Sequence, residues 1–406
     1  MSNTTINSKN FILVTIIPLI IITLIASFTS TWVLTAVPIG FLFGFFLQKG
    51  DLCGASAFSE VILMKDWRKM YGIWIAIVVS MIGFAVIDLS GLVNLNPKHF
   101  FWMNQIFGGL IFGIGMVLAG GCICGCLFKA GSGNLNSIIA LIGAPIGVCM
   151  VKDGPLNSLF IYMKTFVIKS HEGAPITLYS LTGLPFWCLS LFFGIVTLAL
   201  VLFFNSSKSK QSIKDSSNHS LLIRSWKPWQ AGLAIGFLSI VAYISSAESG
   251  RNYSLGVTGG VVGTYYLMTE KNLNHVWHKF INTNNSNMVN AKKTQKMKPK
   301  SAPKKKKVVW WLVTLVFSLV FGSWNSARLS GKAKLLPKPP EQIIIAFCGG
   351  LLIGIGAAFA MGCIIGNILS GWAMMSLGTI LFGITAMLSN WATTYFYLMG
   401  GSLFNR

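Results

Sequence analysis

Long apolar stretches separated by short polar ones run along most of this chain of 406 residues. Five of them approach the roughly 20 apolar residues that an α-helix needs to cross a lipid bilayer. They are Phe11 to Thr29, Gly72 to Leu92, Phe186 to Phe204, Val308 to Phe321 with an extension to Trp324, and Ser376 to Met399. The pattern predicts an all-α, polytopic membrane protein.

Shorter apolar runs lie between these stretches and end at glycine, cysteine or charged residues. Broken backbone at membrane depth is tolerated only where protein or a water-filled cavity surrounds it. Such short, interrupted runs therefore favour pairs of re-entrant helices over full spans. The breaks are expected at Gln48 to Phe58, Cys122 to Ala130, Glu248 to Gly260 and Cys363 to Met375.

One interrupted run occurs twice. Gly108 to Gly125, GGLIFGIGMVLAGGCICG, returns 241 residues later as Gly349 to Gly366, GGLLIGIGAAFAMGCIIG, with 11 of 18 positions identical. Glycines and a cysteine repeated in register indicate a duplicated unit. In membrane chains, paired Gly-interrupted segments in corresponding halves point to a transport site. We expect two pseudo-symmetric repeats, residues 1–182 and 183–406, whose short re-entrant helices meet centrally, with inverted copies if each half crosses an odd number of times.

Composition supports the membrane assignment and narrows the function. Only 10% of residues are charged, against about 25% in soluble domains. The net charge of +22 is concentrated at 208–227 and 271–307, as is typical of basic cytoplasmic loops, and no nucleic-acid motif accompanies it. The second stretch is predicted to be a low-complexity loop. Its His275 and His278 favour solvated side chains over a metal site.

The eight cysteines avoid the long polar loops, which excludes a secreted disulfide framework. Cys149, Cys188 and Cys348 are typical of small buried residues. The sequence between Cys122 and Cys126 reads C-x-C-x-C and lacks the C-x-x-C spacing of zinc sites and dithiol enzymes. We therefore expect no metal, no cofactor and no enzymatic activity. Three other positions stand out because each cysteine is next to a glycine at a helix break: Cys53, Cys122 and Cys363.

Lys129 lies in a largely apolar segment, where a cation favours an anionic ligand. The alternative is a side chain that extends to the membrane interface. Helices that begin at the Gly-Cys breaks would add partial positive charge at their N-termini. The chain carries no P-loop, so ATP hydrolysis is not expected.

Three stretches resemble the cysteine motifs of the YeeE/YedE family of sulfur-compound transporters: GDLCGASAF from Gly50, AGGCICGCLFKAGSGN from Ala119 and MGCIIGNILSG from Met361. The resemblance extends from about Ile39 to Met399. It implies an hourglass-like helical protein of the inner membrane that takes up thiosulfate. Cys53, Cys122 and Cys363 would pass the anion along by weak S–H···S hydrogen bonds without forming a covalent bond. The substrate-binding residues beside them would be Gly54, Gly121, Gly125, Lys129, Gly362, Gly366 and Asn367.

Thiosulfate is a dianion with a soft terminal sulfur, and weak thiol donors suit conduction because each site must also release its ligand. Asp51, in the first motif, would place an acid close to this anion path. Two alternatives stay open: a permease for another sulfur or selenium species, and a membrane thiol redox protein. Besides the anion and the lipid bilayer, a cytosolic sulfur-carrier protein is a candidate partner.

Overall fold

The computed structural model describes residues 17–29, 31–168, 175–206, 225–277, 306–331, 333 and 339–400. Within these residues the regular elements are helices, apart from two four-residue strands. Seven helical segments are long and apolar enough to cross a membrane: 32–64, 68–89, 102–131, 135–152, 228–248, 310–329 and 340–359. The prediction of an all-α, multi-pass membrane protein is confirmed.

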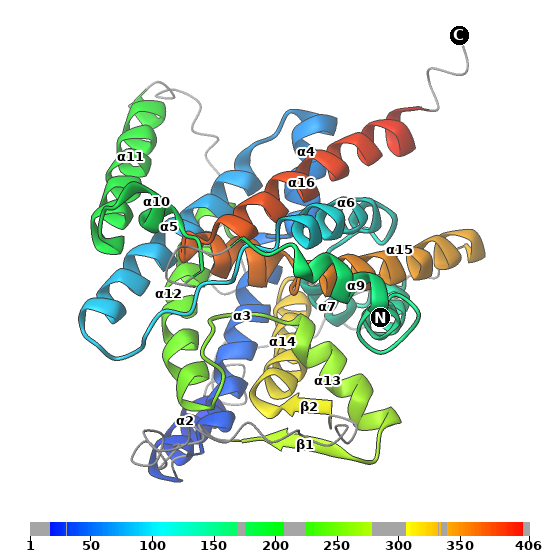
Figure 1. Ribbon diagram of the computed structural model, residues 1–406, viewed down its shortest axis with the longest axis horizontal. Helices are drawn as coiled ribbons and strands as arrows, with labels where there is room; N and C mark the ends of the chain where they lie inside the picture. The colour runs from blue at the N-terminus through cyan, green and yellow to red at the C-terminus, as the bar shows by residue number, and fades with distance from the viewer. Residues whose placement is uncertain are drawn as a thin grey trace, which may run out of the picture.

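Figure 1 shows the helices, which we describe in the two predicted parts of the chain. The first half consists of α2 (Ile17–Thr29), η2 (Trp32–Thr35), α3 (Ala36–Gly50), α4 (Gly54–Met64), α5 (Arg68–Leu89), α6 (Trp102–Leu118), α7 (Ile123–Gly131), α8 (Leu135–Lys152), α9 (Asn157–Thr165) and α10 (Leu178–Thr182). The second consists of α11 (Phe186–Ser206), α12 (Pro228–Glu248), α13 (Thr258–Thr269), β1 (Leu273–Val276), β2 (Lys306–Val309), α14 (Trp310–Leu329), α15 (Pro340–Phe359), η3 (Ile365–Trp372), α16 (Leu377–Thr394) and η4 (Tyr395–Met399).

Helices of one half pack on helices of the other. The helix α3 packs on α14, and its counterpart α12 packs on α5; likewise α8 packs on α15, and α16 packs on α6. Glycines make these contacts close: a Cβ placed on Gly40 would lie 2.5 Å from the carbonyl oxygen of Leu315. Small residues of this kind let helix backbones approach each other in lipid. The exchange of partners is compatible with a pair of pseudo-symmetric repeats, but the repeats, their inversion and the boundary at residue 182 stay predictions.

The two copies of the repeated run lie side by side and antiparallel. A Cβ on Gly108 would lie 2.7 Å from the Ala360 nitrogen, and one on Gly115 would lie 2.7 Å from the Ile353 nitrogen. The beginning of α6 therefore lies beside the end of α15, and the reverse holds at the other end of the pair. The breaks that follow the two helices consequently lie toward opposite ends of the α6–α15 pair.

Two connections between the helices are short. After α4, Lys65 takes a left-handed backbone (φ 55°), and α5 begins at Arg68. The nine-residue helix α9, at 1.5 Å per residue, is too short to cross a bilayer of about 30 Å.

The prediction of a loop over residues 271–307 was wrong at both ends, where the structure has the strands β1 and β2. The strand β1 pairs in parallel with β2, and Leu273 lies opposite Lys306. His275 is not simply solvated, because its Nδ1 accepts a hydrogen bond from the Trp310 indole at 3.0 Å, and Trp277 stacks on the same indole with ring centroids 4.7 Å apart. Residues 278–305, including His278, and most of 208–227 lie outside the described residues.

Candidate functional site

The same turn precedes all three glycine-flanked cysteines. A residue with left-handed backbone stands two positions before each cysteine: Asp51 (φ 46°), Gly120 (φ 67°) and Met361 (φ 54°). Cys53 and Cys122 then take extended backbone as the N-caps of α4 and α7, and Cys363 stands immediately before the helical segment of η3. The turn redirects the chain so that each thiol lies at the start of a short helix, where unpaired N–H groups favour an anion.

The fourth break, between α12 and α13, carries no cysteine. Leu255 occupies the place of Cys53; it is buried, and its carbonyl accepts a hydrogen bond from the Ser370 hydroxyl at 2.9 Å. This break contributes Arg251 and Tyr253 instead. The four breaks therefore supply three thiols and one cationic segment.

Gly125 brings the first two thiols together. Its backbone N–H donates to Cys122 Sγ at 3.3 Å. A Cβ at Gly125 would lie 2.6 Å from Cys53 Sγ and 3.6 Å from Cys122 Sγ, so both sulfurs lie against the same face of this residue. Any side chain here would displace Cys53, which explains why the motif has glycine at this point.

Gly54 joins this pair to the third thiol. A Cβ on Gly54 would lie 2.9 Å from Ile364 Cδ1, so the Cys53–Gly54 segment abuts the Cys363–Ile364 segment. In this series of cysteines, Cys122 and Cys53 lie together at Gly125, and the segment that begins with Cys53 contacts the segment that begins with Cys363 through Gly54 and Ile364. Of the remaining cysteines, Cys149, Cys188 and Cys348 lie away from this series and are partly or fully exposed, while Cys124 and Cys126 are buried within α7.

Lys129 lies at the Cys122 end of the series. Its Nζ donates to the Gly120 carbonyl at 2.6 Å, next to the left-handed turn before Cys122. The acid that the sequence places near this path is already paired, because the Asp51 carboxylate binds Lys69 Nζ at 2.6 Å. Lys69 also binds Glu60 at 2.6 Å. Lys69 therefore holds the Asp51 carboxylate, while the Lys129 cation is held at the turn before Cys122.

Lys98 lies at the Cys363 end of the series, and the sequence analysis did not predict it as a site residue. Its Nζ donates to the Asn367 side-chain oxygen at 2.7 Å and to the Met361 carbonyl at 2.9 Å. Asn367, which was predicted, holds the turn by donating to the Gly362 carbonyl at 2.9 Å. Gly362 leaves room for the lysine, since a Cβ there would lie 2.9 Å from Lys98 Nζ.

Arg251 is the second cation at this end. One of its terminal nitrogens donates to the carbonyls of Ser254 at 2.6 Å and Tyr253 at 3.2 Å. Its guanidinium lies 5.5 Å from the centroid of the Tyr253 ring, and Lys98 Nζ lies 5.1 Å from the same centroid. The Tyr253 hydroxyl donates to the Gly366 carbonyl at 2.5 Å. Burial lowers the pKa of Lys98 to about 7 and that of Arg251 to about 10. The only sequence signal for Arg251 was its place in the motif that lacks cysteine.

The route between the thiols is closed in this structure. The exposed fractions of Cys53, Cys122 and Cys363 are 1%, 1% and 0%. Beside Gly54 and Ile364 lies a cavity of about 30 Å³ with apolar walls, which offers room for about one water molecule. An anion the size of thiosulfate therefore passes only if the helices around this contact move apart.

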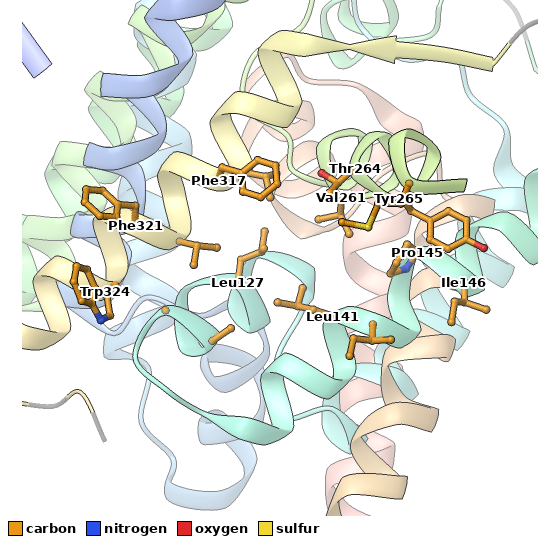
Figure 2. Close-up of a pocket in the computed structure, with 16 residues that line it drawn as sticks. Leu127, Leu141, Pro145, Ile146, Val261, Thr264, Tyr265, Phe317, Phe321 and Trp324 are labelled. Carbon is orange, nitrogen blue, oxygen red and sulfur yellow. The ribbon is translucent and has the colours of Figure 1, made fainter. Parts of the chain in front are cut away.

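A much larger cavity, of about 700 Å³, lies between α7, α8, α13 and α14 (Figure 2). Side chains such as Leu127, Pro145 and Phe317 point into it, and the hydroxyls of Thr264 and Tyr265 are among its few polar atoms. Removing a dianion from water into such surroundings is strongly unfavourable without charged partners. This cavity is therefore not the anion path.

The comparison with known proteins agrees with the motifs. A model of the sulphur transport family matches residues 49–392. The chain belongs to the sulphur transport family. The resemblance to the YeeE/YedE transporters expected from the three motifs is thereby confirmed.

Two relatives are similar to this chain over most of its length. The thiosulfate transporter TsuA of Spirochaeta thermophila is 29% identical over 371 residues, which are 89% of this chain and 98% of the relative. The thiosulfate transporter TsuA of Escherichia coli is 26% identical over 352 residues, 85% of this chain and 88% of the relative. The probable transporter YedE of Escherichia coli is 33% identical over 108 residues, 26% of each chain.

Proposed function

We propose that this protein takes up thiosulfate across the inner membrane, and that Cys53, Cys122 and Cys363 successively bind the terminal sulfur of the anion. The observation that carries the proposal is the set of three buried thiols at the starts of short helices: Cys122 and Cys53 both lie against Gly125, and Gly54 lies against Ile364, the residue after Cys363. The full-length relatives named as thiosulfate transporters support the choice of substrate.

The electrostatics around the series suit a dianion. The N-termini of α4, α7 and η3 add partial positive charge where the thiols lie. Lys129 lies at one end of the series, and Lys98 and Arg251 lie at the other. The thiols are weak hydrogen-bond donors, so each site binds the soft sulfur without trapping it, and no sulfur–sulfur bond has to form or break.

Transport through this site requires a conformational change at the Gly54–Ile364 contact. Because this contact separates Cys53 from Cys363, we propose that Ile364 moves away from Gly54 when the anion passes. Sealing the route with an apolar side chain between two polar sites keeps protons and other ions from leaking through the closed protein.

The test is uptake of [³⁵S]thiosulfate by cells that lack their own thiosulfate transport. Cys53→Ala, Cys122→Ala and Cys363→Ala should each abolish uptake, whereas Cys348→Ala, an exposed cysteine on α15, should leave it intact. The relay is wrong if all three variants of the series retain full uptake. Competition by unlabelled sulfite, sulfate and selenite identifies a permease for a different anion.

A redox protein would give a different result. It would show a reversible disulfide among Cys122, Cys124 and Cys126 on thiol trapping and mass spectrometry, and little uptake. We further propose a cytosolic sulfur-carrier protein as the acceptor of the imported sulfur. Co-purification of such a protein with the transporter from cells grown on thiosulfate would test this part, and failure to co-purify under crosslinking would count against it.

A further inference from the structure

We infer that Lys98, Arg251, Tyr253 and Gly366 enclose a subsite beside Cys363 that binds the oxygen end of a tetrahedral sulfur oxyanion. The inference rests on the proposed function and deepens it. It divides the recognition of thiosulfate into two parts: cations for the three oxygens, and a thiol for the terminal sulfur.

A difference between the two copies of the repeated run leaves an open space beside Gly366. Gly125 and Gly366 are equivalent positions, three residues after Cys122 and Cys363. The position of a Cβ on Gly125 is already blocked by Cys53 Sγ at 2.6 Å, whereas a Cβ on Gly366 would meet no atom within 4 Å, although Gly366 is buried. The second half has Leu255 where the first has Cys53, and the side chain of Leu255 does not fill the gap. The open space therefore lies one helical turn after Cys363, at the position that Cys53 fills in the first copy.

The charges around this space lack counter-ions. Within the described part of the chain, no carboxylate lies within 4 Å of Lys98 or Arg251. By contrast, Lys69, which is likewise only partly exposed, has two carboxylates at 2.6 Å. A partly desolvated cation is stabilised when a counter-ion replaces the water that it has lost. Both Lys98 and Arg251 are also close enough to Cys363 to interact with it electrostatically. A bound anion would supply the missing counter-ion for Lys98 and Arg251.

Hydrogen-bond donors remain available on both cations. The ammonium of Lys98 carries three donors, and two of them reach Met361 and Asn367. The side-chain hydrogen bonds of Arg251 to the described residues all come from one terminal nitrogen, so its Nε and its other terminal nitrogen have no protein acceptor among them. Tyr253 lies against both cations and is anchored through its hydroxyl to Gly366. The remaining donors can therefore converge on the oxygens of one anion.

Binding of [³⁵S]thiosulfate to the purified full-length protein, measured by scintillation proximity, tests the subsite. Lys98→Met and Arg251→Gln should each weaken binding at least tenfold, because each removes a charged donor. Lys98→Arg should retain most of the affinity, since the charge and donors remain. Gly366→Val should also weaken binding, because its side chain occupies the open space. Lys164→Met removes an exposed lysine of the neighbouring α9 and is the matched control, with affinity unchanged.

The outcomes separate the subsite from the proposed function. The subsite is overturned if Lys98→Met and Gly366→Val, eluting from gel filtration as the wild type does, bind thiosulfate as tightly as the wild type. If the wild type binds no thiosulfate, the proposed function fails. Even then the subsite would be supported by binding of [³⁵S]sulfate, which offers oxygens alone, provided that this binding is lost in Lys98→Met and kept in Lys164→Met.

Discussion

Replacing Gly125 by alanine should disable transport while leaving most of the protein folded. The added Cβ would lie 2.6 Å from Cys53 Sγ. Since non-bonded heavy atoms prefer roughly 3.5–4.0 Å, the sulfur has to withdraw by about 1 Å. Overpacking of this kind destabilises a protein by about 1–3 kcal/mol. Alanine offsets part of this, by about 0.5–1 kcal/mol, because it is a better helix former than glycine.

The effect on uptake should be larger than the effect on stability. Moving Cys53 removes one hydrogen bond to a charged ligand, which is worth about 1.5–3 kcal/mol. Each 1.4 kcal/mol corresponds to about a tenfold change, so we expect [³⁵S]thiosulfate uptake in proteoliposomes to fall at least tenfold. Gly194→Ala, in α11, is the control, because a Cβ there meets only the flexible end of Ile82. It should transport normally.

A double variant sharpens this test. Cys53→Ala combined with Gly125→Ala removes the sulfur that the new methyl would displace. The double variant should regain the thermal stability lost by Gly125→Ala, measured as the fraction that stays monodisperse after heating in detergent, but it should not regain uptake. Wild-type uptake by Gly125→Ala, or failure of the second substitution to restore stability, would refute the placement of Cys53 against Gly125.

Three further predictions concern the Cys363 end. Burial lowers the pKa of Lys98 to about 7; Cys363 opposes this shift and Arg251 adds to it. Lys98 is therefore protonated below that pH and loses its charge above it. The KM for thiosulfate should therefore rise between pH 6 and pH 9 in the wild type and stay flat in Lys98→Arg, whose guanidinium remains charged; a flat wild-type profile would contradict this. Met361→Gly should raise the free energy of unfolding by about 1 kcal/mol, because Met361 has a left-handed backbone at φ 54° that glycine adopts without strain. A lower thermal stability of this variant in detergent would contradict that reasoning. Asn367→Asp should reduce thiosulfate binding more than Asn367→Ala does, because the new carboxylate would pair with Lys98 at the 2.7 Å contact; equal losses would show that only the amide's support of the turn matters.

The pattern of apolar runs was sufficient to predict the class of fold. It located the broken helix pairs because glycine and cysteine interrupt apolar sequence where a full span would continue. The repeat of the 18-residue run also predicted equivalent positions for Cys122 and Cys363. Their approach to Cys53 could not be predicted from composition, since it depends on the packing of Gly125 against a sulfur that is 72 residues earlier in the chain.

The cations at the Cys363 end were hidden from sequence reasoning for a different reason. Lys98 lies in a polar connection before α6 and reaches a carbonyl 263 positions away. Nothing local distinguishes it from a solvated loop lysine. The pairing of β1 with β2 was equally hidden, because four-residue strands at the ends of a basic, Asn-rich stretch carry little periodic signal.

The exchange of partners between the halves bears on how the protein is made. Because α3 packs on α14 and α8 on α15, the ribosome has to complete the later helices before the earlier ones find their neighbours. During synthesis the first helices are then separate spans in lipid that expose their glycine faces to one another and to the insertion machinery. A chain cut short after α10 would be left in that condition and exposed to membrane proteases.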